Sequence, residues 1–339
     1  MNRIFLLGLA GLLWSVPSLL AQKAPLRQNL TGYTPPVGEL FYTTSQFHID
    51  GFRRNSQSTL LYAFSEGALI LLDTTGVEVG RKKLKMPKSR RYDRGTFFQL
   101  NIYDDTSQPN TFIIERNDPD NKANRRYRVS MSEDHKLKVE SSTIGKHRIR
   151  SKSVFVEDVE FSAIELMNNE LLLTRQEGTQ IDTLYRTQPL KNGYVMGHGN
   201  ITMQLAGDKL YVLDAAHKKL MIYNTNSGKL LEKMMGFELA KVFENTGPAF
   251  FRSVKLMKDT KAEKLYIVST LVKGKHKQVI YEVTEEGLRP LELPDYDHNR
   301  LQLYFIKQIY DGHVYLSAKV IFEEDWQILK VALDTFKAG

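Results

Sequence analysis

The stretch KLYVLDAAHKKLMIYNTNSGKLLEKM occupies positions 209–234, and its apolar residues alternate in short runs that turn-forming residues interrupt. This pattern predicts three antiparallel strands with two turns between them. The strands are expected at 210–213, 220–223 and 229–234, and the turns at 214–218 and 226–228. Because a lone meander would leave one apolar face in water, this unit must pack against other sheets.

The same pattern recurs along the chain. Residues 60–84, LLYAFSEGALILLDTTGVEVGRKKL, give the same order of strands and turns, as do residues 111–141 and 265–293, with weaker copies at 170–196 and 314–334. The third strands are expected to begin near Ala68, Arg126, Thr183, Leu220, Gln278 and Trp326. The copies are spaced by roughly 50 residues on average, which is a propeller period.

Each copy also follows an apolar or alternating segment that can serve as an inner strand. These segments are residues 47–52, 96–103, 154–161, 202–205, 250–257 and 303–309. Six units of four strands predict an all-β chain folded as a six-bladed β-propeller, with seven blades as the alternative. An open stack of sheets or a sandwich pair is a further alternative, but such folds rarely keep this spacing over so long a chain.

The last copy lacks a fourth strand, whereas the segment ELFYT at 39–43 precedes the first inner strand and has no blade of its own. We expect this segment to pair with residues 326–333 as the outer strand of the final blade. Such pairing joins the beginning of the chain to its end and removes an exposed sheet edge. The predicted ring is therefore closed by an N-terminal strand.

The N-terminus predicts export. Arg3 precedes an apolar run at 4–16, and Ala21 stands at a plausible cleavage position. The run is shorter than the ~20 apolar residues that a bilayer-spanning helix needs, so it reads as a signal peptide. The expected organisation is a signal peptide at 1–21, a linker at 22–37 and a single β-propeller domain at 38–339. The periplasm, the outer surface or the external medium is the expected location.

Composition narrows the expected partners. The chain has no cysteine and carries a formal net charge of +8. Without disulfides its stability must come from a packed core, which fits a bacterial exported protein. For an exported basic protein, an anionic glycan, peptide or protein surface is a more natural partner than nucleic acid. No transmembrane segment is expected, and the oligomeric state stays open.

Two of the copies carry a family resemblance. LMIYNTNSGKLLEKM at 220–234 resembles the third and fourth strands of bacterial YVTN and quinoprotein-like propeller repeats, and ALILLDTTG at 68–76 is similar. Together with the signal peptide, the chain resembles the six-bladed propellers exported by Bacteroidetes-type bacteria. The resemblance implies the fold and little about activity. The tryptophan docking motifs of quinoprotein enzymes are absent, since Trp14 and Trp326 are the only tryptophans.

Motifs for catalysis are sparse. The sequence has no Gly-x-Ser-x-Gly elbow, His-Glu-x-x-His pair or phosphate-binding glycine loop. Weak candidates for acid–base chemistry are Asp295, Asp297, His298 and His198, although turn formation explains the same residues. An alternative function is a propeller hydrolase, lactonase or lyase that uses these groups, with or without a divalent metal. The favoured interpretation is a protein that is not an enzyme and has neither a cofactor nor a metal site.

Basic residues cluster in two segments that connect successive copies. They are MPKSRRYDRG at 86–95 and STIGKHRIRSKS at 142–153. Propeller topology places such connections on one face, near the mouth of the predicted channel. Guanidinium forks bind carboxylate, sulfate or phosphate, so we expect an anion-binding sector. Its candidate residues are Lys88, Arg90, Arg91, Arg94, Lys146, Arg148, Arg150 and Lys152. The leading hypothesis is therefore a secreted, non-catalytic binding or scaffold propeller with a basic face.

Overall fold

The computed structural model divides the chain into two units, residues 1–34 and 35–339, and its described residues all belong to the second. The described residues are 38–44, 49–63, 68–83, 100–105, 108, 111–118, 123–132, 136–144, 150–165, 170–188, 201–215, 217–235, 242, 254–271, 277–292, 301–320 and 325–338. They form six antiparallel sheets, five with four strands and one with five.

The first three sheets, which we call blades, follow the chain in order from the inner to the outer strand. Blade 1 contains β2 (Ile49–Arg54), β3 (Thr59–Ala63), β4 (Ala68–Leu72) and β5 (Glu78–Lys83). Blade 2 contains β6 (Leu100–Asp104), β7 (Thr111–Asp118), β8 (Ala123–Met131) and β9 (Leu137–Ile144). Blade 3 contains β10 (Arg150–Val156), β11 (Val159–Glu165), β12 (Leu171–Glu177) and β13 (Gln180–Arg186).

The other three blades include the strands from both ends of the described chain. Blade 4 contains β14 (Ile201–Ala206), β15 (Lys209–Asp214), β16 (Lys219–Asn224) and β17 (Leu230–Met235). Blade 5 contains β18 (Lys255–Asp259), β19 (Lys264–Leu271), β20 (Lys277–Thr284), β21 (Gly287–Glu292) and β25 (Lys337–Ala338). Blade 6 contains β22 (Leu301–Tyr310), β23 (His313–Val320), β24 (Trp326–Ala332) and β1 (Glu39–Thr44).

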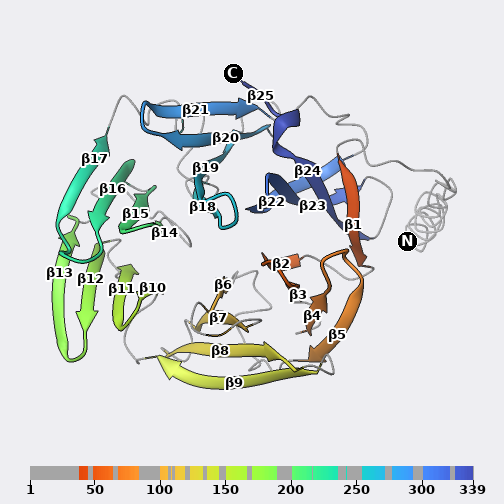
Figure 1. Cartoon of the computed structure of the whole chain (residues 1–339), viewed down its shortest axis with the longest axis horizontal. Coiled ribbons are helices and arrows are strands. Elements are labelled where there is room, and N and C mark those ends of the chain that lie inside the picture. The colour runs from red at the N-terminus through yellow and green to blue at the C-terminus, as the bar shows by residue number, and fades with distance from the viewer. Residues whose placement is uncertain are drawn as a thin grey trace, which may run out of the picture. The chain divides into compact units, whose positions relative to one another are not determined.

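The blades form a closed ring with the first strand of each blade nearest the centre (Figure 1). Strand β1 is antiparallel to β24, with Glu39 opposite Lys330 and Thr44 opposite Trp326. The predicted six-bladed propeller and its closure by an N-terminal strand are therefore confirmed, and the seven-bladed alternative is wrong. The closure covers the outer edge of β24, and β1 becomes the outer strand of blade 6.

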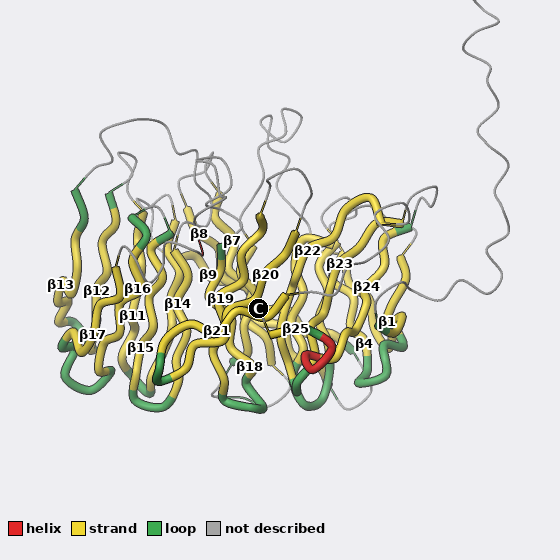
Figure 2. The backbone as a smooth tube through the Cα atoms, turned by 90° about the horizontal axis from the view of Figure 1, so that it is seen from above, coloured by secondary structure: helices red, strands yellow, loops and turns green. Residues whose placement is uncertain are grey.

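Tight turns join strands at one end of the ring, where Figure 2 shows the described turns side by side. The Asp73 carboxylate accepts hydrogen bonds from the backbone N–H groups of Thr75 (2.8 Å) and Val77 (3.0 Å). Asn224 accepts one from the N–H of Ser227 (2.9 Å). Asp and Asn close these turns because their side chains replace backbone partners. We call this side of the ring the tight-turn end.

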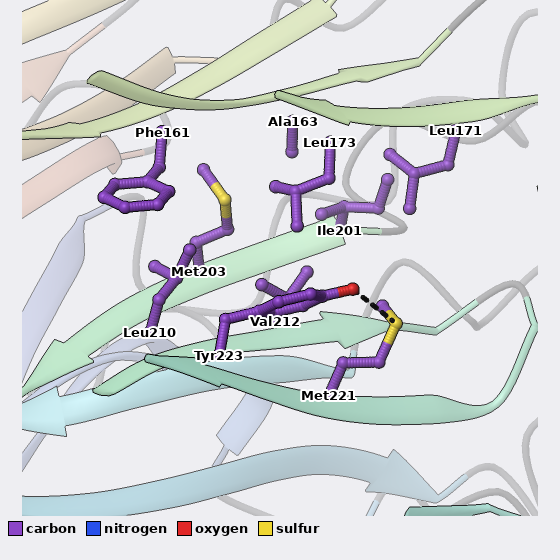
Figure 3. Packing of buried hydrophobic residues seen from close by; sticks show 10 residues of the cluster. All are labelled: Phe161, Ala163, Leu171, Leu173, Ile201, Met203, Leu210, Val212, Met221 and Tyr223. Atoms are coloured by element: carbon purple, nitrogen blue, oxygen red, sulfur yellow. Dashed lines mark hydrogen bonds between the residues drawn. The ribbon is translucent and has the colours of Figure 1, made fainter. Parts of the chain in front are cut away.

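The core lies between blades, where the faces of neighbouring sheets meet. Between blades 3 and 4, Phe161 and Leu173 pack with Val212 and Tyr223, and all four side chains are buried (Figure 3). Burial of apolar surface stabilises such contacts by roughly 25 cal/mol per Å². The Tyr223 hydroxyl keeps a partner in this apolar setting by donating to Met221 Sδ at 3.6 Å. Each blade thus depends on its neighbours for burial of both faces.

Two predictions of strand positions are wrong. The expected inner strand at 154–161 is the end of β10 and the start of β11, which a turn at Glu157 and Asp158 separates. As a result, Thr183 lies in the outer strand β13 instead of starting a third strand. In addition, the chain continues past β24 through a short 3₁₀ helix (Leu333–Thr335) into β25, which pairs with β21 of blade 5.

Candidate anion-binding site on the inner ring

The innermost strands β2, β6, β10, β14, β18 and β22, which we call the inner ring, contact one another through side chains. The Leu256 N–H in β18 donates to Thr202 Oγ1 in β14 at 2.8 Å. The Arg54 N–H in β2 donates to Gln308 Oε1 in β22 at 2.6 Å, and Gln308 Nε2 donates to the Arg54 carbonyl at 2.9 Å. These bonds satisfy edge groups that no strand ladder satisfies, and they fix the relative height of adjacent strands.

Basic residues occupy one level of this ring. Lys152 in β10, Thr202 in β14 and Lys255 in β18 each stand four residues before the end of their strand. The bond between Thr202 and Leu256 confirms that β14 and β18 are aligned at this height. Lys307 of β22 lies near the same height, three residues before the end of its strand. Three of the six inner strands therefore place a lysine at a shared level.

Within the described part of the chain the Lys255 ammonium has neither a hydrogen bond nor an ion pair, unlike the inner-ring cations Arg53, Arg54, Lys258 and Lys307. The residue is exposed, and the flanking strands ITMQLA (β14) and LQLYFIKQIY (β22) contain no acidic residue. Desolvation by the surrounding protein lowers the pKa of Lys255 from its ordinary value.

Other described inner-ring cations have partners. Arg53 Nη2 donates to Asp104 Oδ2 at 2.6 Å and joins blade 1 to blade 2. Lys258 pairs with Glu263. Lys307 Nζ donates to the Ile49 carbonyl at 2.6 Å. The guanidinium of Arg54 lies over the rings of Phe41, Tyr310 and Tyr315 at 5.2, 5.7 and 5.5 Å.

The one fully buried carboxylate of β18 has a structural role. Asp259 Oδ1 accepts from the N–H groups of Lys261 (3.0 Å), Ala262 (3.1 Å) and Asp311 (2.9 Å), and Oδ2 accepts from Gly312 N–H (2.8 Å). Two of these donors belong to blade 5 and two to blade 6. The carboxylate therefore fastens blades 5 and 6 at the tight-turn end.

The predicted anion-binding residues fall into two groups. Arg150 and Lys152 lie in β10, opposite Glu165 and Ala163 of β11, whereas the sequence placed them in a loop. That loop is shorter than expected because β9 continues to Ile144 and β10 begins at Arg150. The remaining candidates lie outside the described residues: Lys88, Arg90, Arg91, Arg94, Lys146 and Arg148. The catalytic candidates Asp295, Asp297, His298 and His198 also lie outside them.

Sequence reasoning assigned no role to Lys255. Its position in the predicted segment 250–257 placed it on an inner strand, but its isolation depends on which strands lie beside β18. The available signal was the absence of any acidic residue from the segments that became β14 and β22. That signal has meaning only after blades 4, 5 and 6 are placed in order around the ring.

A second polar cluster lies at the junction of blades 3 and 4. His217 Nδ1 lies 2.8 Å from Asp214 Oδ2, and Nε2 lies 3.3 Å from the Gln188 carbonyl. The hydrogen bond to Asp214 raises the pKa of His217 more than partial burial lowers it. Lys219 Nζ beside this pair donates to Tyr185 Oη at 3.1 Å. The cluster fastens blade 4 to the segment that follows β13.

A cavity of about 590 Å³ lies between blades 5 and 6. Glu282 on its wall binds both Lys264 and Arg289. Burial alone would raise the pKa of Glu282, but the hydrogen bonds from these two cations outweigh it and lower the pKa. Because both cations are already engaged by Glu282, the cavity presents less unopposed charge than Lys255. No group of three His, Cys, Asp or Glu side chains suited to a metal ion occurs among the described residues.

The structure defines the chain as a six-bladed β-propeller with antiparallel blades and a ring closed by its N-terminal strand. No protein-family model matches the sequence, and no curated protein is a significant match. Membership of the YVTN or quinoprotein-like families therefore stays a prediction. The part of the chain that the structure describes contains no helix with the length and apolarity to cross a membrane.

Solved structures share the general fold at low identity. A luciferin-regenerating enzyme is 9% identical, with a TM-score of 0.47, and the alignment covers 90% of this chain and 95% of that one. An exported-protein candidate from Bacteroides fragilis NCTC 9343 is 11% identical, with a TM-score of 0.46 and coverage of 87% and 91%. A protein of unknown function from Bacteroides caccae is 11% identical, with a TM-score of 0.42 and coverage of 74% and 79%. These likenesses carry no argument about activity.

Proposed function

We propose that this chain is an exported, non-catalytic binding propeller that holds an anionic ligand at the inner ring. The ligand class is an acidic glycan, an acidic peptide or the acidic surface of a protein. The observation that carries the proposal is Lys255, an exposed cation on an innermost strand whose neighbouring inner strands contain no acid. Unopposed positive charge of this kind attracts anions and concentrates them locally.

Chain topology supports the same location. Arg150 and Lys255 are the first residues of β10 and β18, so both stand where the chain enters the inner ring. The basic segments of residues 86–95 and 145–149 lead into β6 and β10 at that same end. Arginines in these segments would add bidentate contacts to carboxylate, sulfate or phosphate groups. The proposed binding surface therefore combines the inner ring with its basic entry segments, and it includes neither a metal nor a cofactor.

Export forms part of the proposal and rests on the signal-like sequence at 1–21. Cleavage after Ala21 would give a mature chain that begins at Gln22. N-terminal sequencing of the protein recovered from the periplasm or medium of an expressing bacterium should read from Gln22. Recovery of the protein only in the cytoplasm with Met1 intact would contradict export.

Binding to immobilised heparin tests the anion site with equal changes in net charge. The site variant replaces Arg150, Lys152 and Lys255 by Gln, and the control variant replaces the exposed residues Lys83, Lys209 and Lys229 by Gln. We expect the site variant to elute at clearly lower salt than the control variant, because it removes clustered rather than dispersed charge. Melting temperatures of both variants establish that the ring is intact.

Equal elution of the two variants would show that net charge alone drives retention, and it would overturn the proposed site. A site variant that still melts as the parent does but binds no heparin supports it. Raising the ionic strength should release the parent protein, since exposed charges are screened beyond about 10 Å at 0.1 M salt.

A further inference from the structure

We infer that the cavity between blades 5 and 6 is a second ligand site, which takes a neutral polyhydroxyl ligand, namely one sugar unit. This inference goes beyond the proposed function, because none of the residues that line the cavity belongs to the proposed anion site. The cavity volume of about 590 Å³ lies within the range of roughly 300–1,000 Å³ that small-molecule sites occupy. The donors and acceptors on its wall indicate the ligand class.

One face of blade 5 forms the polar wall of the cavity. Glu282 in β20 lies opposite both Tyr266 of β19 and Arg289 of β21, and Lys264 stands two residues before Tyr266. Because alternate residues of a strand share a face, these four side chains lie together. Glu282 accepts hydrogen bonds from Lys264 Nζ at 3.0 Å and from Arg289 Nη2. These bonds hold the three charged groups in place beside the phenol.

Tyr266 brings to this wall a polar group that the fold leaves unused. The residue is 3% exposed and lines the cavity, and its hydroxyl has no hydrogen-bond partner among the described residues. Buried polar side chains in native proteins usually have such a partner. Burial raises the pKa of Tyr266 to about 12, with smaller contributions from Glu282 and Asp259, so the phenol stays protonated. It can both donate to a ligand hydroxyl and accept from one.

His313 supplies an acceptor on the blade 6 side of the cavity. Its Nδ1 lies 2.7 Å from the Asp311 carbonyl oxygen, and because a carbonyl oxygen only accepts, Nδ1 carries the proton. In the uncharged ring Nε2 therefore keeps its lone pair. Within the described part of the chain Nε2 has no partner, and His313 lines the cavity. This position requires a ligand group that donates.

The charged groups favour a neutral ligand. Both cations of the wall share the Glu282 carboxylate, so an anionic ligand would have to displace it. Arg289 binds Glu282 through Nη2 only and its side chain is 58% exposed, which leaves its other N–H groups for a ligand. A carboxylate or phosphate can only accept and an ammonium can only donate, whereas a hydroxyl does both. Neighbouring hydroxyls of a sugar can therefore accept from Arg289, donate to His313 and bind Tyr266.

The C-terminal segment completes the cavity with apolar surface. After β24 the chain forms the 3₁₀ helix near the tight-turn end (Figure 2) and joins β21 through β25. The Leu333 N–H donates to the Gly312 carbonyl at 2.8 Å, and Phe336 is 4% exposed. Both residues line the cavity together with Leu291. Their side chains provide a surface for the C–H groups of a sugar ring, so the site needs both blades and the chain end.

Saturation-transfer NMR on the full protein tests the site, with D-glucose, D-galactose, D-mannose and N-acetyl-D-glucosamine as probes at about pH 8, where an ordinary imidazole is uncharged. We expect the parent protein to bind at least one of these sugars. Its dissociation constant should rise by roughly two- to tenfold in Tyr266→Phe, the effect of one lost hydrogen bond. His313→Asn keeps a donor for the Asp311 carbonyl but lacks Nε2, and it should show a similar loss. The control Tyr127→Phe removes a buried hydroxyl outside the cavity and should bind as the parent does.

Two further measurements separate ligand binding from a structural role. Because the Tyr266 hydroxyl has no partner in the described structure, Tyr266→Phe should not lower the melting temperature. Its elution from heparin should match that of the parent, since the anion site lies elsewhere.

Acetate and glycine serve as anionic and zwitterionic probes for the same cavity. Binding of either probe in place of the sugars would overturn the inference, as would the absence of saturation transfer to every sugar. Equal sugar affinities in Tyr266→Phe, His313→Asn and Tyr127→Phe would place the sugar outside the cavity and would also overturn it. None of these outcomes changes the heparin comparison of the glutamine variants, so the proposed function is tested separately.

Discussion

His217 connects two blades through contacts that depend on its charge. The backbone N–H of His217 donates to Asp214 Oδ1 at 3.1 Å, while the ring contacts Asp214 Oδ2 and the Gln188 carbonyl. Only the protonated ring can donate to both acceptors at once. The charged groups that face it are Asp214, which raises its pKa, and Lys219, which lowers it slightly. The Asp214 hydrogen bond prevails, so the folded protein binds the proton more tightly than the unfolded chain does.

This linkage predicts a pH-dependent stability. Because the folded pKa of His217 lies above its unfolded value of about 6.5, its contribution is complete below about pH 6.5 and is lost as the pH rises through the raised pKa. The free energy of unfolding from urea titrations should therefore fall as the pH rises above about 6.5. In His217→Gln, which keeps a donor but cannot become charged, this fall should be smaller.

The comparison between parent and variant isolates His217 from the other titrating groups. At acidic pH the variant should be less stable than the parent by about 1.5 to 3 kcal/mol, the usual contribution of a hydrogen bond to a charged group. As the pH rises past the raised pKa of His217, the two curves should approach each other. A difference that stays constant across the pH range would mean that the ring acts through packing alone.

At the scale of elements, the outer strands of four blades share one irregularity. The pairing of β5, β13, β17 and β1 with the third strand of their blade skips one residue in each case. The skipped residues are Val79, Leu184, Leu231 and Phe41. A bulge bends and twists an outer strand. In β1 the skipped Phe41 is 9% exposed and contacts the Tyr315 ring edge-on at 5.4 Å.

Phe41 therefore carries the apolar part of the ring closure, and its neighbour Leu40 provides a matched control. Leu40 is 50% exposed on the same strand. Truncation of a buried phenylalanine removes its burial and leaves a cavity, so Phe41→Ala should lower the free energy of unfolding by about 3 kcal/mol. Leu40→Ala should change it by well under 1 kcal/mol. Urea unfolding followed by circular dichroism measures both.

Similar losses in the two variants would contradict a specific role for Phe41 and would indicate a general effect of shortening side chains in β1. The same measurement on Arg54→Gln bears on the surrounding cluster, since the Arg54 guanidinium lies over the Phe41 ring at 5.2 Å. The double variant should lose less unfolding free energy than the sum of the losses in Arg54→Gln and Phe41→Ala, because the effects of substitutions at contacting residues are not additive.

The sequence predicts elements well where side chains define a turn. Asp73 and Asn224 close their turns with their own carboxylate or amide, and both turns were expected. Blade 3 was misread because its first turn consists of Glu157 and Asp158, with Glu157 at φ 51°, and neither glycine nor proline marks it. Strand β25 was missed because two residues carry no periodicity, and its place depends on where β21 lies.

The candidate site shows the same limit. Arg150 and Lys152 were selected from a basic run in the sequence, which composition alone reveals. Lys255 could not be selected this way, because it stands among apolar residues of β18 and its lack of a partner depends on β14 and β22. Those strands are about 50 residues away on either side, at the propeller period. Whether a charged residue has an opposite charge beside it therefore depends on how the blades assemble into the ring.

At the scale of the whole molecule, a named contact joins every pair of neighbouring blades. In order around the ring the contacts are Arg53–Asp104, Arg126 over Phe155, Lys219–Tyr185, Leu256–Thr202, Gly312–Asp259 and Arg54–Gln308. An open array of repeats can fray from its ends, because each terminal repeat has one neighbour. A closed ring has no terminal blade, so all six blades should unfold together.

Trp326 reports this coupling, because it begins β24 beside the closure strand and is 7% exposed. In a protein that starts at Gln22 it is the only tryptophan, since Trp14 is upstream. Its fluorescence and the far-ultraviolet circular dichroism should then change at the same urea concentration.

A variant that starts at residue 45 lacks β1 and has an open ring with blade 6 at its edge. Its fluorescence transition should come at clearly lower urea than the loss of circular dichroism, because blade 6 can unfold before the others. An excess of a peptide with the sequence of residues 35–48 should bring the two transitions together again, and a scrambled peptide should not. Coincident transitions in the variant without peptide would show that the blades are coupled by their junctions alone and that closure by β1 is dispensable.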